Sequence, residues 1–185
     1  MRGEGGKKHR GGGIAGRIFR LILLVLCFLA LSFGAVPFLG YTVTVESGAM
    51  TPELEIGQKV AVNRAAYILF NPRRGDIVQF HADDHESETY IRRVIALPGE
   101  TVQIMDGKIY INGNVLEEDY TEESIQYAGI ASVQLTLGER EYFLLADNRN
   151  NNFDSRDPTV GTVDKSSILG RVWIRISPIQ ELKLL

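Results

Sequence analysis

Cysteine is almost absent from this sequence, and its scarcity excludes two kinds of site. Cys27 is the one cysteine among 185 residues, so no disulfide can form within the chain and no thiolate cluster can hold a metal ion. Cys27 also lies inside an uncharged apolar run, where a cysteine behaves as a small packing residue. Because no other motif calls for a metal ion or a cofactor, we expect neither.

Formal charge is missing altogether from residues 21–39, LILLVLCFLALSFGAVPFL. Nineteen uncharged residues are about the length that an α-helix needs to cross the hydrocarbon core. Six cations against one acid precede the run, which places the N-terminus in the cytoplasm by the positive-inside rule. The alternative is a cleaved secretory signal, although the run is longer than the usual apolar region of such a signal. The sequence therefore predicts a single-pass protein of the cell membrane, with a basic cytoplasmic tail over 1–20, a transmembrane helix over 21–39 and an extracytoplasmic domain over 40–185.

Positive charge is deficient after the basic tail. Residues 21–185 hold 14 Lys and Arg against 22 Asp and Glu, a net charge of −8. An acidic domain argues against nucleic-acid binding and against a second electrostatic contact with the membrane. Roughly 145 residues follow the apolar run, which is enough for one compact domain of ordinary size.

Long amphipathic helices are also missing beyond Gly40, where short runs alternate with period two. These runs are rich in β-branched and aromatic residues, and they predict strands. Asp106-Gly107 is typical of a two-residue type I′ hairpin, and Asn112-Gly113 is a second tight-turn signal. We therefore predict a mostly β domain, either a partly open barrel or a sandwich. The predicted strands cover residues 41–45, 59–63, 76–80, 89–96, 101–105, 108–112, 132–137, 141–145 and 171–176.

Four segments, in order along the chain, carry a family resemblance. Residues 46–54, ESGAMTPEL, resemble the S-G-S-M-x-P-T-L stretch of type I signal peptidases, and residues 74–80, RGDIVQF, resemble their R-G-D-I-V-V-F strand. Residues 90–100, YIRRVIALPGE, are similar to Y-I-K-R-V-I-G-L-P-G-D. Residues 146–156, ADNRNNNFDSR, are similar to G-D-N-R-D-N-S-x-D-S-R. The resemblance implies a β-rich signal-peptidase-like fold and an activity that cuts signal peptides from exported proteins after small residues.

The resemblance also implies a serine nucleophile and a lysine base, and both positions are substituted here. Ala49 stands at the nucleophile position, and its methyl group has no lone pair with which to attack. Arg92 stands at the base position, where a guanidinium with a pKa above about 12 stays protonated. Asn152 replaces the serine that orients the lysine in the family. The family is a serine-type endopeptidase, but this chain is predicted to be inactive as it stands.

Other positions of the family motifs are retained. The resemblance assigns Ser47 to the oxyanion hole, where its hydroxyl helps the backbone N–H of the nucleophile position. It places Met50 and Pro52 at the cleft. It also implies structural ion pairs under the site, formed by Arg93, Asp147, Asp154 and Arg156.

The substitutions leave two explanations of Ala49 open, laboratory inactivation and natural divergence. One change would be enough to stop the reaction, whereas three positions differ, which favours divergence. The prediction is a protein without cleavage activity that binds an extended segment of an exported preprotein or pilin by strand addition. By resemblance to inactive relatives, it would assist secretion or pilus assembly. The alternatives are a type I signal peptidase with introduced substitutions or a rearranged site that uses Ser47, and a purely structural membrane subunit.

Two clusters of chemically capable side chains have simpler explanations. Residues 81–86, HADDHE, hold potential metal ligands but follow a predicted strand, which favours a solvated turn. The acidic residues between 117 and 123, with Tyr120 among them, are typical of a solvated face.

Overall fold

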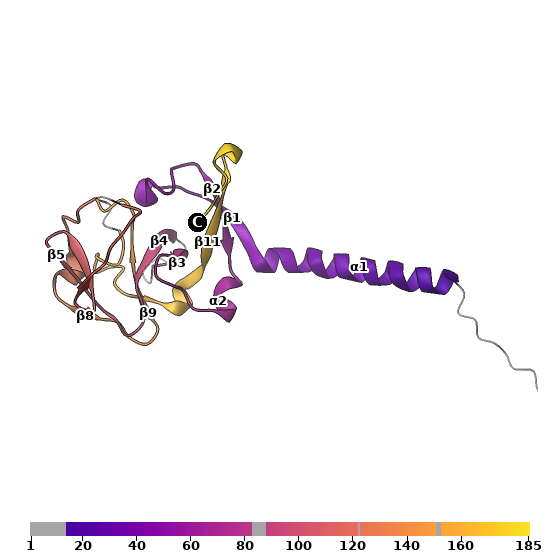
Figure 1. The fold of residues 1–185 in the computed structure, drawn as a ribbon, viewed down its shortest axis with the longest axis horizontal. Coiled ribbons are helices and arrows are strands. Elements are labelled where there is room, and N and C mark those ends of the chain that lie inside the picture. The colour runs from indigo at the N-terminus through magenta and orange to yellow at the C-terminus, as the bar shows by residue number, and fades with distance from the viewer. Residues whose placement is uncertain (1–13, 83–87, 122, 151–152) are drawn as a thin grey trace, which may run out of the picture. The chain divides into compact units, whose positions relative to one another are not determined.

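The computed structural model describes residues 14–82, 88–121, 123–150 and 153–185. The chain divides into two units, Met1–Phe38 and Leu39–Leu185. Helix α1 (Ile14–Leu39) accounts for the described part of the first unit (Figure 1). No helix formed by the described residues is both long enough and apolar enough to cross a membrane. The transmembrane span over 21–39 and the orientation inferred from it therefore stay predictions.

The second unit is a β domain, as the period-two pattern predicts, and it contains two sheets. The strands of the larger sheet are β1 (Gly40–Thr44), β2 (Lys59–Asn63), β3 (Ile77–His81), β4 (Thr89–Ala96), β9 (Glu141–Leu145), β10 (Val163–Asp164), β11 (Ile168–Ser177) and β12 (Lys183–Leu184). The smaller sheet consists of β5 (Thr101–Met105), β6 (Lys108–Ile111), β7 (Asn114–Val115) and β8 (Leu135–Thr136). The short helices are α2 (Ala66–Leu69) and the 3₁₀ turns η1 (Gly48–Met50), η2 (Gly129–Ser132), η3 (Lys165–Ser167) and η4 (Ile179–Glu181).

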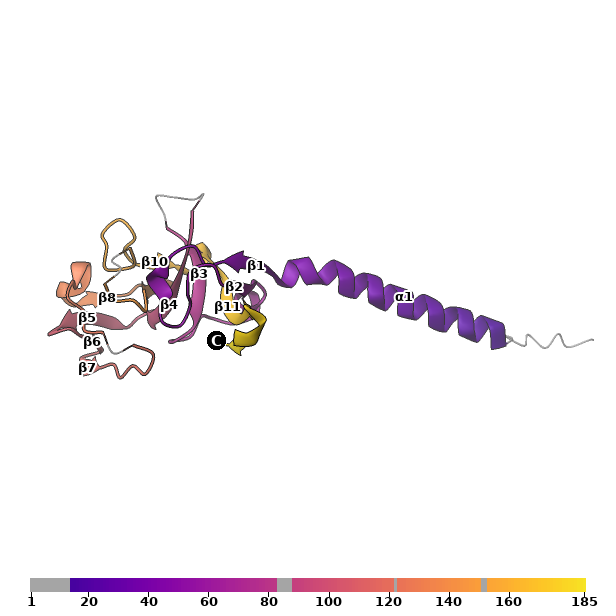
Figure 2. The same cartoon turned by 90° about the horizontal axis from the view of Figure 1, so that it is seen from above.

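Neither sheet closes on itself within the described residues. The larger sheet has the order β1-β2-β11-β3-β4-β9-β10, with β12 paired to β11, and the smaller has the order β7-β6-β5-β8. Within the β domain, Figures 1 and 2 both show the smaller sheet at one end and β1 and β2 at the other. The fold is therefore mostly β and open, and β1 is an edge strand.

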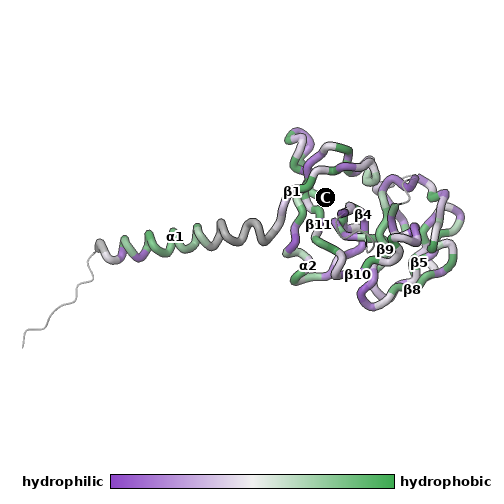
Figure 3. The backbone as a smooth tube through the Cα atoms, turned by 180° about the vertical axis from the view of Figure 1, so that it is seen from behind, coloured by the Kyte–Doolittle hydropathy of each residue, from purple (hydrophilic) through white to green (hydrophobic). Residues whose placement is uncertain are grey.

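The hairpin turns form where the sequence predicts them. Asp106 and Gly107 join β5 to β6 with φ values of 50° and 74°, and Asn112 and Gly113 join β6 to β7 with 51° and 78°. A type I′ turn needs positive φ at both central residues, which glycine and asparagine or aspartate tolerate best. Figure 3 shows polar and apolar residues interspersed along the chain of this domain, as expected for strands with one face toward the core.

One predicted strand is largely wrong. The run over 132–137 was expected to pair along its length, but its first residue ends η2 and only β8 pairs, through two residues opposite β5. Val133 is 67% exposed, whereas Leu137 is buried in the core and Leu135 packs against it, so the alternation marks a buried face only in the second half of this run. The pattern is the same as that of a strand, but residues 132–134 do not pair with β5, although β5 continues to Met105, because Ser132 ends the 3₁₀ turn η2.

An apolar cluster under β1, β2, β3 and β11 holds the η1 turn in place. Met50 and Leu54 are buried in it beside Val60 and Val172. Burying a side chain of this size contributes about 1.5–3 kcal/mol. The segment that carries Ala49 is therefore anchored to the core by the residues that follow it.

Gly129 is expected to tolerate no side chain. It has φ +55°, and a Cβ added to it would lie 2.0 Å from the carbonyl oxygen of Arg156. Gly129→Ala should therefore lower the free energy of unfolding by roughly 3 kcal/mol or more, since both strain and overlap act. Gly113→Ala is the matched control, because Gly113 has φ +78° but open space around its Cβ position; it should cost about 1–2 kcal/mol. Urea unfolding curves compare them, and equal losses would contradict the steric argument.

Candidate functional site

The residue at the nucleophile position is buried in a tightly held turn. Ala49 has no exposed surface, and its carbonyl accepts a hydrogen bond from the backbone N–H of Asn148 at 3.0 Å. The Oγ1 of Thr51 donates to the carbonyl of Gly48 at 2.8 Å. The turn is thus held by the chain that follows β9 as well as by the core, and it presents no nucleophilic atom at position 49.

The residue at the base position is a buried cation. Arg92 lies on β4 and is 3% exposed. Its Nε and Nη2 donate to the carbonyl of Phe153 at 2.9 and 2.5 Å, and its Nη1 donates to the carbonyl of Ile91 at 2.6 Å. Burial lowers the pKa of Arg92 to about 10, which is less than the sequence suggests but still well above neutral pH. Arg92 therefore remains protonated and cannot accept a proton from a nucleophile.

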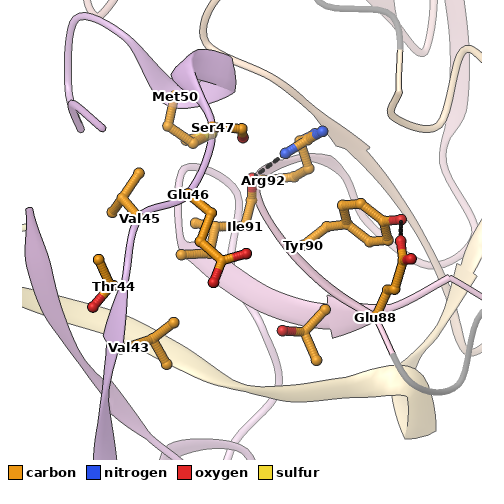
Figure 4. Close-up of a pocket in the computed structure, with 11 residues that line it drawn as sticks. Val43, Thr44, Val45, Glu46, Ser47, Met50, Glu88, Tyr90, Ile91 and Arg92 are labelled. Atoms are coloured by element: carbon orange, nitrogen blue, oxygen red, sulfur yellow. Dashed lines mark hydrogen bonds between the residues drawn. The ribbon is translucent and has the colours of Figure 1, made fainter. Parts of the chain in front are cut away.

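A pocket of about 430 Å³ opens beside these residues. One wall is formed by residues 43–47 together with Met50, and the other by residues 88–92 (Figure 4). Ser47 is exposed on the first wall and Arg92 lies on the second. The hydroxyl of Ser47 makes no hydrogen bond to any part of the chain that the structure describes. The pocket thus presents an uncommitted hydroxyl at Ser47 and a cation at Arg92.

Both walls of the pocket are strand edges that pair with no further strand among the described residues, although the carbonyl of Ile91 accepts a hydrogen bond from Arg92 Nη1 at 2.6 Å. β1 pairs with β2 only, and β9 pairs with β4 only from Arg93 onward, among the residues described. The N–H of Val94 donates to Asp76, next to β3, and its carbonyl accepts from Gly75. Because backbone groups alternate sides along an antiparallel strand, those of Ile91 point away from β3, toward the pocket. An edge of this kind is a template for an added strand.

The four residues expected to form ion pairs lie together beside the site. Arg93 donates to both carboxylate oxygens of Asp147, at 2.8 and 2.5 Å. Arg156 donates to both oxygens of Asp154, at 2.9 and 2.7 Å, and neither partner has exposed surface. Burial raises the pKa of Asp147, and the hydrogen bond from Arg93 opposes this effect. The Arg93–Asp147 pair joins the 146–156 segment to β4, and the Arg156–Asp154 pair lies within that segment.

A third buried ion pair has no counterpart in the sequence-based predictions. Arg149 is 2% exposed and donates to both oxygens of Glu118, and its backbone N–H donates to Glu123 at 2.9 Å. The ring of Tyr120 lies 4.1 Å below the guanidinium carbon of Arg93. The prediction that the acidic run is a solvated face is therefore wrong for Glu118 and Tyr120. No local signal reveals this pairing, since the partners are 31 residues apart.

Two of the candidate positions cannot be placed. Asn152 and the 83–87 part of the His81 loop lie outside the described residues. Pro52 is exposed just after the η1 turn and does not line the pocket. Among the described residues, no group of three or more His, Cys, Asp or Glu side chains is arranged to hold a metal ion.

Comparisons with known proteins agree with the motif resemblance. The family described as signal peptidase, peptidase S26, matches residues 18–177. Signal peptidase I of Leptolyngbya laminosa is 35% identical over 162 residues, which cover 83% of this chain and 77% of that protein. Signal peptidase I of Bacillus licheniformis is 33% identical over 170 residues, 88% of each. A solved signal peptidase I from Enterococcus faecalis is 34% identical and covers 56% of this chain and 97% of that one, with a TM-score of 0.46. The chain belongs to the signal peptidase family, peptidase S26.

Proposed function

We propose that this chain is a member of the signal peptidase family that binds an extended segment of an exported preprotein without cleaving it. One observation carries the proposal: the nucleophile position holds Ala49 and the base position holds Arg92, a protonated guanidinium bound to two backbone carbonyls. Neither residue can perform its step of the serine and lysine reaction. The η1 turn, the pocket beside it and the ion pairs of Arg93 and Arg156 are all present.

The pocket suits an extended peptide because both of its walls are strand edges. A segment inserted between residues 43–47 and 88–92 would hydrogen-bond to backbone on either side, which is the strand-addition mode of peptide recognition. Backbone pairing supplies affinity that does not depend on the sequence of the bound segment. This supports recognition of a class of exported proteins rather than a single one.

The proposal extends to the process and the location. The bound segment belongs to a preprotein or a pilin, and the chain assists secretion or pilus assembly on the extracytoplasmic side of the cell membrane, anchored by residues 21–39. Support comes from the relatives' description as signal peptidases and from the apolar run with basic residues before it.

A second candidate function is cleavage by a rearranged site, or by the natural form of a chain bearing introduced substitutions. The naming of the relatives as signal peptidase I favours it. Among the described residues that line the pocket, Ser47 is the one serine, and neither a lysine nor a histidine is present to act as its base. A nucleophile without a positioned base is weak at its ordinary pKa.

Cleavage assays separate the two functions. The full-length protein in detergent, incubated with a signal-peptide substrate, should release product at the rate of the buffer control, while it still binds the uncleaved peptide. Cleavage that disappears in Ser47→Ala would contradict the proposal and establish the rearranged site. Ser132→Ala is the control, because Ser132 is exposed in η2, away from the pocket.

A further inference from the structure

The four buried arginines of the β domain are not equivalent. Three of them, Arg93, Arg149 and Arg156, each donate two hydrogen bonds to one carboxylate. Arg92 is 3% exposed, and among the described residues it contacts backbone carbonyls but forms no ion pair with a carboxylate. Asp154 and Asp147 act on Arg92 through space, but a buried cation that no anion contacts is costly, so the site favours an additional anion in direct contact.

The guanidinium of Arg92 retains hydrogen-bonding capacity. An arginine side chain has five N–H donors, and Arg92 uses three of them on the carbonyls of Phe153 and Ile91. Among the described residues, one N–H on Nη1 and one on Nη2 have no acceptor, and each is able to donate to a carboxylate oxygen. Burial lowers the pKa of Arg92, and an anion beside it would reverse that effect.

The position of Arg92 within the pocket selects the kind of anion. Figure 4 shows Ser47 and Arg92 at one end of the pocket, with Val43 and Glu88 at the other. Glu46 also lines the pocket, so a ligand with several negative charges would be repelled along the walls. A ligand with a single negative charge at one end, and neutral backbone elsewhere, fits this distribution.

The direction of the walls fixes which end of a peptide would meet Arg92. Both walls run the same way, from Val43 to Ser47 and from Glu88 to Arg92 (Figure 4), in agreement with the four antiparallel pairings that separate β1 from β4 in the sheet. A peptide that lies parallel to both walls therefore places its C-terminus beside Arg92 and the hydroxyl of Ser47. Because position 49 of the same turn holds alanine and not serine, this position offers no hydroxyl to the C-terminus of the peptide.

We propose that Arg92, assisted by Ser47, binds the C-terminal carboxylate of an extended peptide, so that the preferred ligand is a chain with a free C-terminus ending in the pocket. Such a ligand is the product of a peptide-bond hydrolysis carried out elsewhere, rather than the substrate of one. This inference rests on the proposed peptide-binding function. In this proposal, the residue at the base position of the family binds an anion and does not accept a proton.

The test compares two peptides that differ only in their terminal charge. The probe is an acetylated octapeptide of alternating threonine and valine that ends in alanine, prepared with either a free carboxylate or a C-terminal amide. Calorimetry with the full-length protein in detergent should show that the acid binds about ten-fold or more tightly than the amide, because a charge-assisted pair is lost in the amide. Equal affinities would overturn the carboxylate proposal and leave strand addition intact. Binding of neither peptide would overturn both.

Variants assign the preference to Arg92. Arg92→Gln should bring the acid-to-amide ratio close to one, and Arg92→Lys should keep part of it because the charge remains. Arg140→Gln is the control, since Arg140 is exposed and paired with Asp164; its ratio should equal that of the unaltered chain. If a folded Arg92→Gln variant kept the acid-to-amide affinity ratio of the unaltered chain, the assignment to Arg92 would be overturned. If Arg92→Gln does not fold, the acid-to-amide affinity ratios of the unaltered chain and of Arg92→Lys still test the proposal.

Discussion

Restoring the nucleophile and the base together, in Ala49→Ser with Arg92→Lys, is expected to raise signal-peptide cleavage by at least about 10³-fold over the unaltered chain. The scaffold for the reaction is kept: the η1 turn is held by the N–H of Asn148 and by buried Met50, and Ser47 is retained at the oxyanion position. Lysine on β4 would replace a guanidinium that cannot lose its proton by an amine that can. Release of product from a fluorogenic signal peptide is the measurement.

The pH dependence identifies the new base. The lysine must be neutral to take the serine proton, so the recovered rate should rise with pH until that lysine is deprotonated. Each single variant should stay near the background, because nucleophile and base act as a unit. Adding Asn152→Ser should raise the rate further if this position orients the lysine. A double variant that folds and binds peptide but does not cleave would show that the shape of the pocket has diverged along with its chemistry.

Removing the cation of the most deeply buried ion pair, by Arg156→Gln, is expected to cost about 3–5 kcal/mol of unfolding free energy. Asp154 would be left as a buried carboxylate without a cation, and the carbonyl of Arg149 would lose a hydrogen bond of 2.8 Å. For a chain of this size the loss corresponds to a fall in Tm of about 10 °C. Thermal unfolding followed by circular dichroism measures it.

Arg140→Gln makes the same substitution in an exposed pair. The side chain of Arg140 is 63% exposed and that of its partner Asp164 is 40% exposed, so solvent already screens the interaction. Its Tm should stay close to that of the unaltered chain. A comparable fall in both variants would mean that burial is not what makes the Arg156 pair important.

Local patterns account for a large part of the fold. β2, β4, β5 and β9 have the bounds that alternation predicts, and Asp106-Gly107 forms its turn because the conformation is determined by two residues and their neighbours. The run over 132–137 carries the same alternation and yet forms only β8, since its first residues belong to or follow η2 and do not pair with β5. A period-two pattern reports which residues are able to form a strand, and the structure around them decides how many do.

The sequence by itself determined the family, through four motifs in order, and the chemical deficit at Ala49 and Arg92, because a methyl group and a guanidinium have the same limits in any fold. Tertiary structure alone decided what those residues do instead. The pocket exists because β1 and the first half of β4 are left unpaired on their facing edges. Arg92 differs from Arg93, Arg149 and Arg156 in that no carboxylate of the described residues contacts it; Asp154 and Asp147 act on it only through space. The ion pairs of these arginines join residues up to 54 positions apart, and the hydrogen bond from Arg92 to Phe153 spans 61 positions, so no local pattern encodes them.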